Sequence, residues 1–192
     1  ATLFLTRFFT GSMRIIGGEL GGRRINPPAS MPHTRPTTDI AREGLFNIIT
    51  NNIDLAECST LDLFGGTGSI SYELASRGAH ELTIVEKDPV MYEFIRKTSD
   101  ILGIKSCTIL KMDVFRFMAQ ATASYDLIFA GPPYALTNID DIPRLIFDKK
   151  LLKVGGWFIL EHTPRNDYKK FEGYTTERKY GTTIFSIFIR RE

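Results

Sequence analysis

Residues 60–68 read Thr-Leu-Asp-Leu-Phe-Gly-Gly-Thr-Gly, a short apolar run that passes directly into a glycine-rich turn. The apolar run is typical of a buried strand, and the glycines let backbone approach a ligand at the start of the next helix. The turn lacks the third glycine of a nicotinamide fingerprint, because Gly66-Thr67-Gly68 is followed by Ser69-Ile70-Ser71. Asp62 would repel a pyrophosphate and suits an amine-bearing ligand. A plain strand-to-helix turn is the alternative.

Strands and helices are expected to alternate from this stretch onward. The predicted strands are 60–64, 81–86, 106–112, 125–130 and 157–162, and the predicted helices are 70–76, 89–102, 115–120 and 140–150. This order predicts an α/β fold with right-handed crossovers and a mostly parallel, buried sheet. Two further strands, 175–180 and 183–190, are separated by only Gly181-Thr182, too few residues for a crossover helix. They should therefore be antiparallel.

The chain upstream of residue 51 is expected to be an extension of that main domain, which runs over 51–192. Residues 13–25 predict a β-hairpin, and residues 26–36 hold four prolines that exclude a regular element. An N-cap at Thr37-Thr38-Asp39 then predicts a helix. Residues 13–50 form the predicted RNA-binding extension, and residues 1–12 are expected to be an expression remnant or upstream segment.

Composition limits the class of protein. The 192 residues, 43% hydrophobic and 24% charged, fit one globular domain with a small appendage. There is no run of 18 apolar residues, which excludes a transmembrane helix, and the two cysteines, Cys58 and Cys107, favour a reduced, cytoplasmic setting. Net charge is +3 over residues 1–46, −4 over 47–161 and +3 over 162–192. Basic ends around an acidic centre are compatible with a polyanion partner, although a charge excess of this size more often marks only a solvated surface.

Three further loops follow predicted strands, where ligands bind in open α/β sheets. Glu86 ends the second strand and could accept hydrogen bonds from ribose hydroxyls. Asp113 follows the third strand, where it could accept from an adenine amine or cap the next helix. Gly131-Pro132-Pro133-Tyr134 follows the fourth strand and offers carbonyl acceptors beside an aromatic ring, or forms a rigid loop with a packed tyrosine.

These loops, in this order, resemble class I S-adenosylmethionine-dependent methyltransferases. The stretches MRIIGG and GRRI, TRPTTDIAREGLFNII, LDLFGGTGSIS, VEKD and the xPPY loop resemble one family in particular over residues 13–190. This is the bacterial small-subunit ribosomal RNA guanine-N2 methyltransferase family called RsmD. The resemblance implies a Rossmann-like, seven-stranded, mostly parallel sheet with an antiparallel last strand and a small N-terminal hairpin.

The resemblance also implies S-adenosylmethionine as cofactor and roles for individual residues. The motif that holds the amino-acid part of the cofactor is matched by Asp62, Phe64, Gly66 and Gly68. Glu86 matches the acid that binds the ribose, and Asp113 matches the acid on the adenine side. A motif that closes over the methionine end is matched by Arg35, Pro36 and Thr37. Gly131, Pro132, Pro133 and Tyr134 match the catalytic loop. The implied reaction is methyl transfer to the exocyclic N2 amine of a guanine in 16S ribosomal RNA.

The catalytic loop departs from the family pattern at its first position. The family has Asp-Pro-Pro-Tyr, whereas this chain has Gly131 in place of the aspartate. In the pattern, that side chain and a proline carbonyl accept hydrogen bonds from the target amine. Loss of one such bond costs roughly 1.5–3 kcal/mol, or about 10- to 150-fold in rate. The departure suggests impaired activity and not its loss; an altered allele, an engineered variant or a binding-only paralogue are the alternatives.

The expected partner is 16S ribosomal RNA or an assembling small ribosomal subunit, bound by a monomer. Arg14, Arg23, Arg24 and Arg42 are the candidate phosphate contacts; for Arg23 and Arg24 a solvated hairpin tip is the alternative. We expect no metal, because His33, His80 and His162 are scattered and form no cluster with cysteine. Cys58 and Cys107 have no histidine near them in sequence, which disfavours a cysteine nucleophile.

Three other functions stay open from the sequence. A cofactor-binding but catalytically impaired RNA-binding paralogue is motivated by Gly131. A DNA adenine amino-methylase shares the xPPY chemistry, but 192 residues leave little room for a target-recognition region. A small NAD-dependent oxidoreductase is opposed by the missing third glycine and by the antiparallel tail.

Overall fold

The computed structural model describes residues 12–29 and 37–192 of the chain. Its strands are β1 (Met13–Arg14), β2 (Arg24–Ile25), β3 (Ser59–Leu63), β4 (Glu81–Val85), β5 (Cys107–Leu110), β6 (Tyr125–Ala130), β7 (Leu152–His162), β8 (Tyr174–Tyr180) and β9 (Thr183–Ile189). Its helices are α1 (Asp39–Asn52), α2 (Ser69–Ser76), α3 (Pro89–Ile101), α4 (Val114–Gln120) and α5 (Asp141–Asp148), with a short 3₁₀ helix at Leu55–Glu57.

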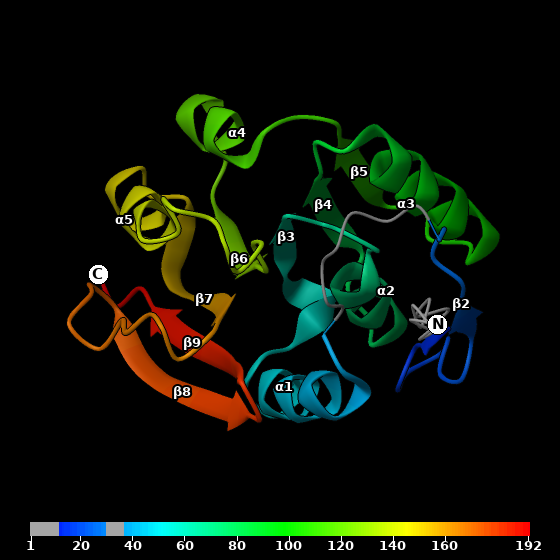
Figure 1. The fold of residues 1–192 in the computed structure, drawn as a ribbon, viewed down its shortest axis with the longest axis horizontal. Helices are drawn as coiled ribbons and strands as arrows, with labels where there is room; N and C mark the ends of the chain where they lie inside the picture. The colour runs from blue at the N-terminus through cyan, green and yellow to red at the C-terminus, as the bar shows by residue number, and fades with distance from the viewer. Residues whose placement is uncertain (1–11, 30–36) are drawn as a thin grey trace, which may run out of the picture.

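The main sheet has seven strands in the order β5-β4-β3-β6-β7-β9-β8. Strands β3 to β7 pair in parallel, whereas β9 is antiparallel to both β7 and β8 (Figure 1). The predicted α/β class, the seven strands and the antiparallel last strand are therefore confirmed. The N-terminal hairpin is also present, but β1 and β2 pair over only two residues each.

Strand β7 is longer than the predicted segment 157–162, because it begins at Leu152. Gly155 and Gly156 interrupt the apolar pattern and indicate a turn in the sequence. In the structure they lie within the strand, at a register shift opposite residues 125–127, and Gly155 has a φ of 81°. The glycines therefore mark an irregularity in the strand.

Helices cover both faces of the sheet. On one face α1 and α2 pack against residues such as Leu127, Phe129 and Ile159, in a single apolar cluster. On the other face α4 and α5 pack against a second cluster that includes Leu63 and Phe158. Because both faces of the sheet are covered, the last four residues of β3 and the last four of β6 are all buried.

The hairpin extension is attached to α2 through Glu73, which is fully buried. Its two carboxylate oxygens accept hydrogen bonds from the backbone N–H groups of Ile16 (2.7 Å) and Gly17 (2.9 Å). Arg77 completes the site with an Nε–Oε2 contact of 2.9 Å. Met13, Ile15 and Ile25 add an apolar contact with α2 and α3. This buried carboxylate fixes the position of the hairpin.

The strand order reverses between β3 and β6. The chain goes from β3 outward to β4 and β5, then returns to the other side of β3 with β6. The crossover helices leave this point on opposite faces, which opens a crevice at the carboxyl ends of the strands. The loops singled out in the sequence follow β3, β4, β5 and β6, so they meet at this crevice.

Candidate functional site

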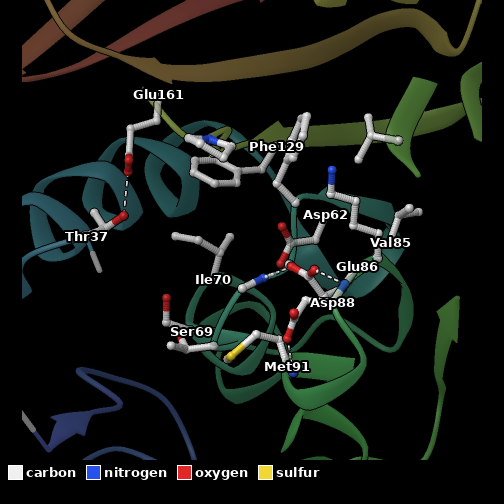
Figure 2. Close-up of a pocket in the computed structure, with 18 of the residues that line it drawn as sticks. Thr37, Asp62, Ser69, Ile70, Val85, Glu86, Asp88, Met91, Phe129 and Glu161 are labelled. Carbon is white, nitrogen blue, oxygen red and sulfur yellow. Dashed lines mark hydrogen bonds between the residues drawn. The ribbon is translucent and has the colours of Figure 1, made fainter. Parts of the chain in front are cut away.

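A cavity of about 330 Å³ lies at the switch point of the sheet. Its walls come from the carboxyl ends of β3, β4, β6 and β7, together with Met112, Asp113 and Val114 after β5. Figure 2 shows Thr37 and Glu161 on one side of the cavity and Asp62, Glu86 and Asp88 gathered on the other. The volume is in the range of small-molecule sites in proteins.

Asp62 lies at the end of β3 with a side chain that is only 2% exposed. Ser71 of α2 donates a hydrogen bond to its Oδ2 at 2.7 Å. Burial raises the pKa of Asp62 to about 7, the Ser71 hydrogen bond opposes this, and the charge of Glu86 adds to it. A buried carboxyl that titrates near neutrality and lines a cavity is a candidate partner for a cationic ligand group.

The turn after Asp62 has the left-handed backbone that its glycines permit. Gly68 is the N-cap of α2 with a φ of 83°, and a side chain there would overlap the ring of Tyr72. Gly66 also has a positive φ, of 58°, and a side chain there would meet little but open space. Gly66 and Phe64 line the cavity. Gly68 does not line it, but its backbone conformation sets the turn that leads into α2.

Glu86 joins two loops of the site. Its Oε1 accepts from the N–H of Gly66 at 2.9 Å and its Oε2 accepts from the N–H of Asp88 at 2.8 Å. These bonds fix the glycine turn after β3 against the loop after β4. Each oxygen still has a lone pair for a ligand hydroxyl, because a carboxylate offers about four acceptor positions.

Asp88 and Asp113 are helix caps as well as lining residues. Asp88 accepts from the N–H of Met91 (2.9 Å) at the start of α3, and Asp113 accepts from the N–H of Arg116 (3.0 Å) at the start of α4. The capping role considered for Asp113 is thus confirmed. Its role toward an adenine stays a prediction.

The Gly131-Pro132-Pro133-Tyr134 loop borders the cavity through Gly131 and Pro133. Gly131 directly follows β6, and its N–H donates to the carbonyl of Leu63 at 3.3 Å. The carbonyl of Pro133 accepts from the N–H of Leu136 at 3.0 Å, so it closes a turn. Pro132 is buried behind the cavity wall.

Glu161, near the carboxyl end of β7, was not among the residues expected from the sequence. Its side chain is 5% exposed and lines the cavity. The hydroxyl of Thr37 donates to Oε1 and the hydroxyl of Tyr134 donates to Oε2 at 3.1 Å. Burial raises the pKa of Glu161, and the two hydroxyl hydrogen bonds oppose that effect. The carboxylate thus joins the segment before α1 to the proline loop.

A usable signal for Glu161 was present in the sequence. The apolar run Trp-Phe-Ile-Leu of β7 is followed by Glu161, just as β4 is followed by Glu86, and Asp62 is the last residue but one of β3. A carboxylate at the end of a third buried strand deserves the same weight as the first two. His162, which follows it, is also buried, with Nε2 2.6 Å from Ser186 Oγ.

Of the arginines expected to bind RNA, three lie on the exposed surface and one does not. Arg14, Arg23 and Arg24 project from the hairpin, and Arg14 Nε lies 3.1 Å from Asp39 Oδ2. Arg42 is only 1% exposed and its guanidinium pairs with Asp39. This burial contradicts the prediction of a phosphate contact for Arg42, because a side chain with so little exposed surface is not available to a phosphate in solution. Arg35 and Pro36 lie outside the described residues.

Neither cysteine contributes to the site. Cys58 precedes β3 and Cys107 begins β5, so both lie at the opposite edge of the sheet from the cavity. Burial raises the pKa of each thiol to about 11, which keeps the sulfur protonated. Over residues 12–29 and 37–192, no three histidine, cysteine, aspartate or glutamate side chains are grouped so as to hold a metal ion. No helix in these ranges is long and apolar enough to cross a membrane.

Comparison with known proteins places the chain among methyltransferases. Residues 13–189 match the sequence family described as conserved hypothetical protein 95. Ribosomal RNA small subunit methyltransferase D of Escherichia coli K12 is 33% identical over 139 residues, which span 72% of this chain and 69% of that protein. The structure of an Escherichia coli protein described as a candidate methyltransferase, yhhF, superposes with a TM-score of 0.81 at 26% identity, covering 94% of this chain and 99% of the other.

A more distant structure shares the fold alone. It is the Thermus thermophilus 16S rRNA N2 G1207 methyltransferase RsmC in complex with AdoMet and guanosine, at 22% identity and a TM-score of 0.72. The match covers 94% of this chain and 50% of that one. The fold is therefore one that methyltransferases use.

Proposed function

The chain belongs to the family described as conserved hypothetical protein 95, the RsmD methyltransferases, and on that premise we propose that it methylates the N2 amine of a guanine in 16S ribosomal RNA. The single observation that carries the proposal is the grouping of Asp62, Glu86 and Asp113, from three successive strand ends, around one cavity that the proline loop also borders. The similarity to the Escherichia coli relative supports ribosomal RNA as substrate.

The lining residues fit S-adenosylmethionine. A buried carboxyl at Asp62 suits an ammonium group, Glu86 has lone pairs for ribose hydroxyls, and Asp113 lies at the third strand end, where an adenine amine would be accepted. The cofactor supplies a methyl group on a sulfonium: as the amine lone pair forms the new N–C bond, the C–S bond breaks and its electron pair stays on sulfur.

The protein's part in this reaction is to hold and orient the amine. A guanine N2 lone pair is delocalised into the ring, so hydrogen-bond acceptors that fix the two N–H groups contribute much of the rate. The proline loop supplies backbone carbonyls beside the cavity, and Tyr134 supplies an aromatic side chain there. Access to a stacked guanine requires that the base leave its stack.

The exposed arginines of the hairpin support an RNA substrate. Arg14, Arg23 and Arg24 lie on an element that is fixed against α2, so their charges have a defined position relative to the site. Contacts of this kind give affinity for the phosphate backbone and leave sequence choice to other features. An assembled subunit surface would supply that choice.

The test is methyl transfer from labelled S-adenosylmethionine to small ribosomal subunits that lack this modification. We expect label in 16S RNA, recovered as N2-methylguanosine after nuclease digestion and mass spectrometry. Label in DNA adenine, or in no nucleic acid at all, contradicts the proposal. Matched subunits that already carry the modification are the control and should take up no label.

A second candidate is a protein that binds cofactor and RNA without turnover. Gly131 favours it, because a glycine offers no side-chain acceptor to the amine. Binding of S-adenosylmethionine by calorimetry, with no transfer at any protein concentration, is the outcome that would support this candidate.

A further inference from the structure

The carboxylates that line the cavity fall into two groups. Asp62, Glu86, Asp88 and Asp113 follow β3, β4 and β5, on the half of the cavity that we assign to the cofactor. Glu161 is the only lining carboxylate among the described residues on the other half, beside the proline loop (Figure 2). It is therefore the one placed toward the target amine.

The sheet register places Glu161 beside Gly131. Strands β6 and β7 are parallel and Ala130 pairs with Leu160, so the next position brings Gly131 opposite Glu161. Neighbouring strands lie about 4.8 Å apart, and paired residues of a parallel sheet point to the same face. A side chain at 131 would point the same way as Phe129, whose ring would lie 3.1 Å from its Cβ. Glu161 thus presents a carboxylate on the face where Gly131 presents nothing.

Among residues 12–29 and 37–192, no cation compensates the charge of Glu161. Only the neutral hydroxyls of Thr37 and Tyr134 are seen to bond its oxygens, and no lysine or arginine of the described residues forms an ion pair with it. A buried carboxylate without a cation lowers stability, because desolvation is not repaid by Coulomb attraction. Groups kept at such a cost are often functional.

We propose that Glu161 is a catalytic residue that accepts a hydrogen bond from the target amine, in place of the side chain that Gly131 lacks. This inference rests on the proposed function, since it concerns the same reaction. Each oxygen of Glu161 has a second lone pair after the bonds to Thr37 and Tyr134, and one of these lone pairs accepts from the amine N–H.

The proton balance follows from the same contact. When the N–C bond has formed, the nitrogen carries a positive charge and must release one proton. The Glu161 carboxylate accepts that proton, becomes neutral, and later returns it to water, while the sulfur keeps the electron pair of the broken C–S bond. The raised pKa of Glu161 favours this transfer, because the buried site prefers the neutral acid.

The first test measures recognition without turnover. Guanosine and inosine differ by the 2-amino group, so their affinities for the protein saturated with S-adenosylhomocysteine report the amine contact. We expect the wild-type protein to bind guanosine roughly 10- to 100-fold more tightly than inosine, and Glu161→Gln to reduce this ratio to about threefold or less. An unchanged ratio in Glu161→Gln overturns the proposal. The ratio compares two ligands on one protein, so it stays meaningful if the variant is less stable.

The second test is rescue from the neighbouring strand. Glu161→Gln should lower kcat by roughly 10- to 150-fold, with the cofactor Kd within about threefold of wild type. Gly131→Asp should change the wild-type rate by less than about threefold, but should raise the rate of Glu161→Gln by about tenfold or more. If Gly131→Asp changes the rate by the same factor in the wild-type protein and in Glu161→Gln, the two carboxylates do not replace each other and the proposal is overturned.

A purely structural role for Glu161 gives a different pattern. If Glu161 serves only to join Thr37 to Tyr134, then Tyr134→Phe, which removes one of its hydroxyl partners, should lose as much activity as Glu161→Gln, and Gly131→Asp should rescue neither. Glu93→Gln, on the exposed face of α3, is the matched control and should leave rate and recognition unchanged. Guanosine discrimination without methyl transfer by any variant would contradict the proposed function and leave the Glu161 contact standing.

Discussion

Asp62 is a buried carboxyl whose ionisation the fold opposes. An unfolded chain releases this proton near pH 4, whereas the folded chain holds it until the pKa of about 7. Between these values the folded state binds more protons than the unfolded state, so the stability of the cofactor-free protein falls as pH rises through this window. The negative charge of Asp62 at the cavity therefore lowers the stability of the folded protein.

Replacement of Asp62 by Asn should show both the cost of this charge in stability and its contribution to cofactor binding. Asn cannot ionise, so we expect Asp62→Asn to be more stable than wild type at pH 8, by up to roughly 4 kcal/mol, with a smaller gain at pH 5. The same variant should bind S-adenosylmethionine at least about tenfold more weakly, since an ammonium group loses its buried counter-charge. Thermal melts at both pH values and calorimetry measure the two effects, with the exposed Asp148→Asn as control. Lower stability of Asp62→Asn at pH 8 would contradict this account.

Among the elements, α2 has two tasks. Its N-terminal turn borders the cavity, and its Glu73 side chain holds the hairpin through two backbone N–H groups and Arg77. The extension and the cofactor half of the site thus share one short helix. A substitution at Glu73 should therefore affect both the hairpin and the cofactor half of the site.

We expect Glu73→Gln to destabilise the protein by about 2–4 kcal/mol, because the amide cannot accept with both ends and leaves Arg77 without its counter-charge. Chemical denaturation measures the loss, and hydrogen exchange should show faster exchange at Ile16 and Gly17. Glu93→Gln breaks a comparable helix ion pair with Arg96 at the surface, and should cost at most about 1 kcal/mol. Equal effects of the two substitutions would mean that the burial of Glu73 contributes nothing.

The hairpin should contribute to the affinity for the small ribosomal subunit and should not affect kcat. Replacement of both Arg23 and Arg24 by Gln should weaken binding to the small subunit several-fold and lower the slope of log K against log salt by about 1–2, with kcat at saturation unchanged. Filter binding over a salt series measures the slope. Lys149 and Lys150 are exposed between α5 and β7, on the opposite side of the molecule from the hairpin (Figure 1), so their replacement by Gln is the charge-matched control. If kcat falls while the slope of log K against log salt is unchanged, the hairpin does not contribute to RNA binding.

For the whole molecule, the alternation of strands and helices was predictable, because central strands such as β4 and β6 contain apolar runs that are followed by a charged residue or glycine. The side-chain environments were not predictable. Arg42 has the spacing of a surface residue, and only the structure shows that its side chain is buried and pairs with Asp39. Glu161 is one charge at the end of a strand, and its meaning depends on Gly131 in the neighbouring strand. Pairing across the sheet is long-range information that a local pattern does not contain.

Ligand binding should stabilise the whole molecule through the cavity at its centre. S-adenosylmethionine at 100 times its Kd should add about 2.7 kcal/mol to the free energy of unfolding, which raises the melting temperature by several degrees. NADH at the same concentration should have no effect. Differential scanning fluorimetry separates the two, and a shift with NADH alone would revive the oxidoreductase alternative.

The position of β9 in the sheet also has a consequence during synthesis. Strand β7, which carries Glu161, has β9 as its outer neighbour, and β9 follows the other strands of this sheet in chain order, so it is translated after them. Until residues 183–189 leave the ribosome, β7 is an open edge with unpaired backbone groups, which other nascent chains could join. The parallel core can assemble earlier, so the target side of the cavity is completed last and a chain stopped before Thr183 would be prone to aggregate.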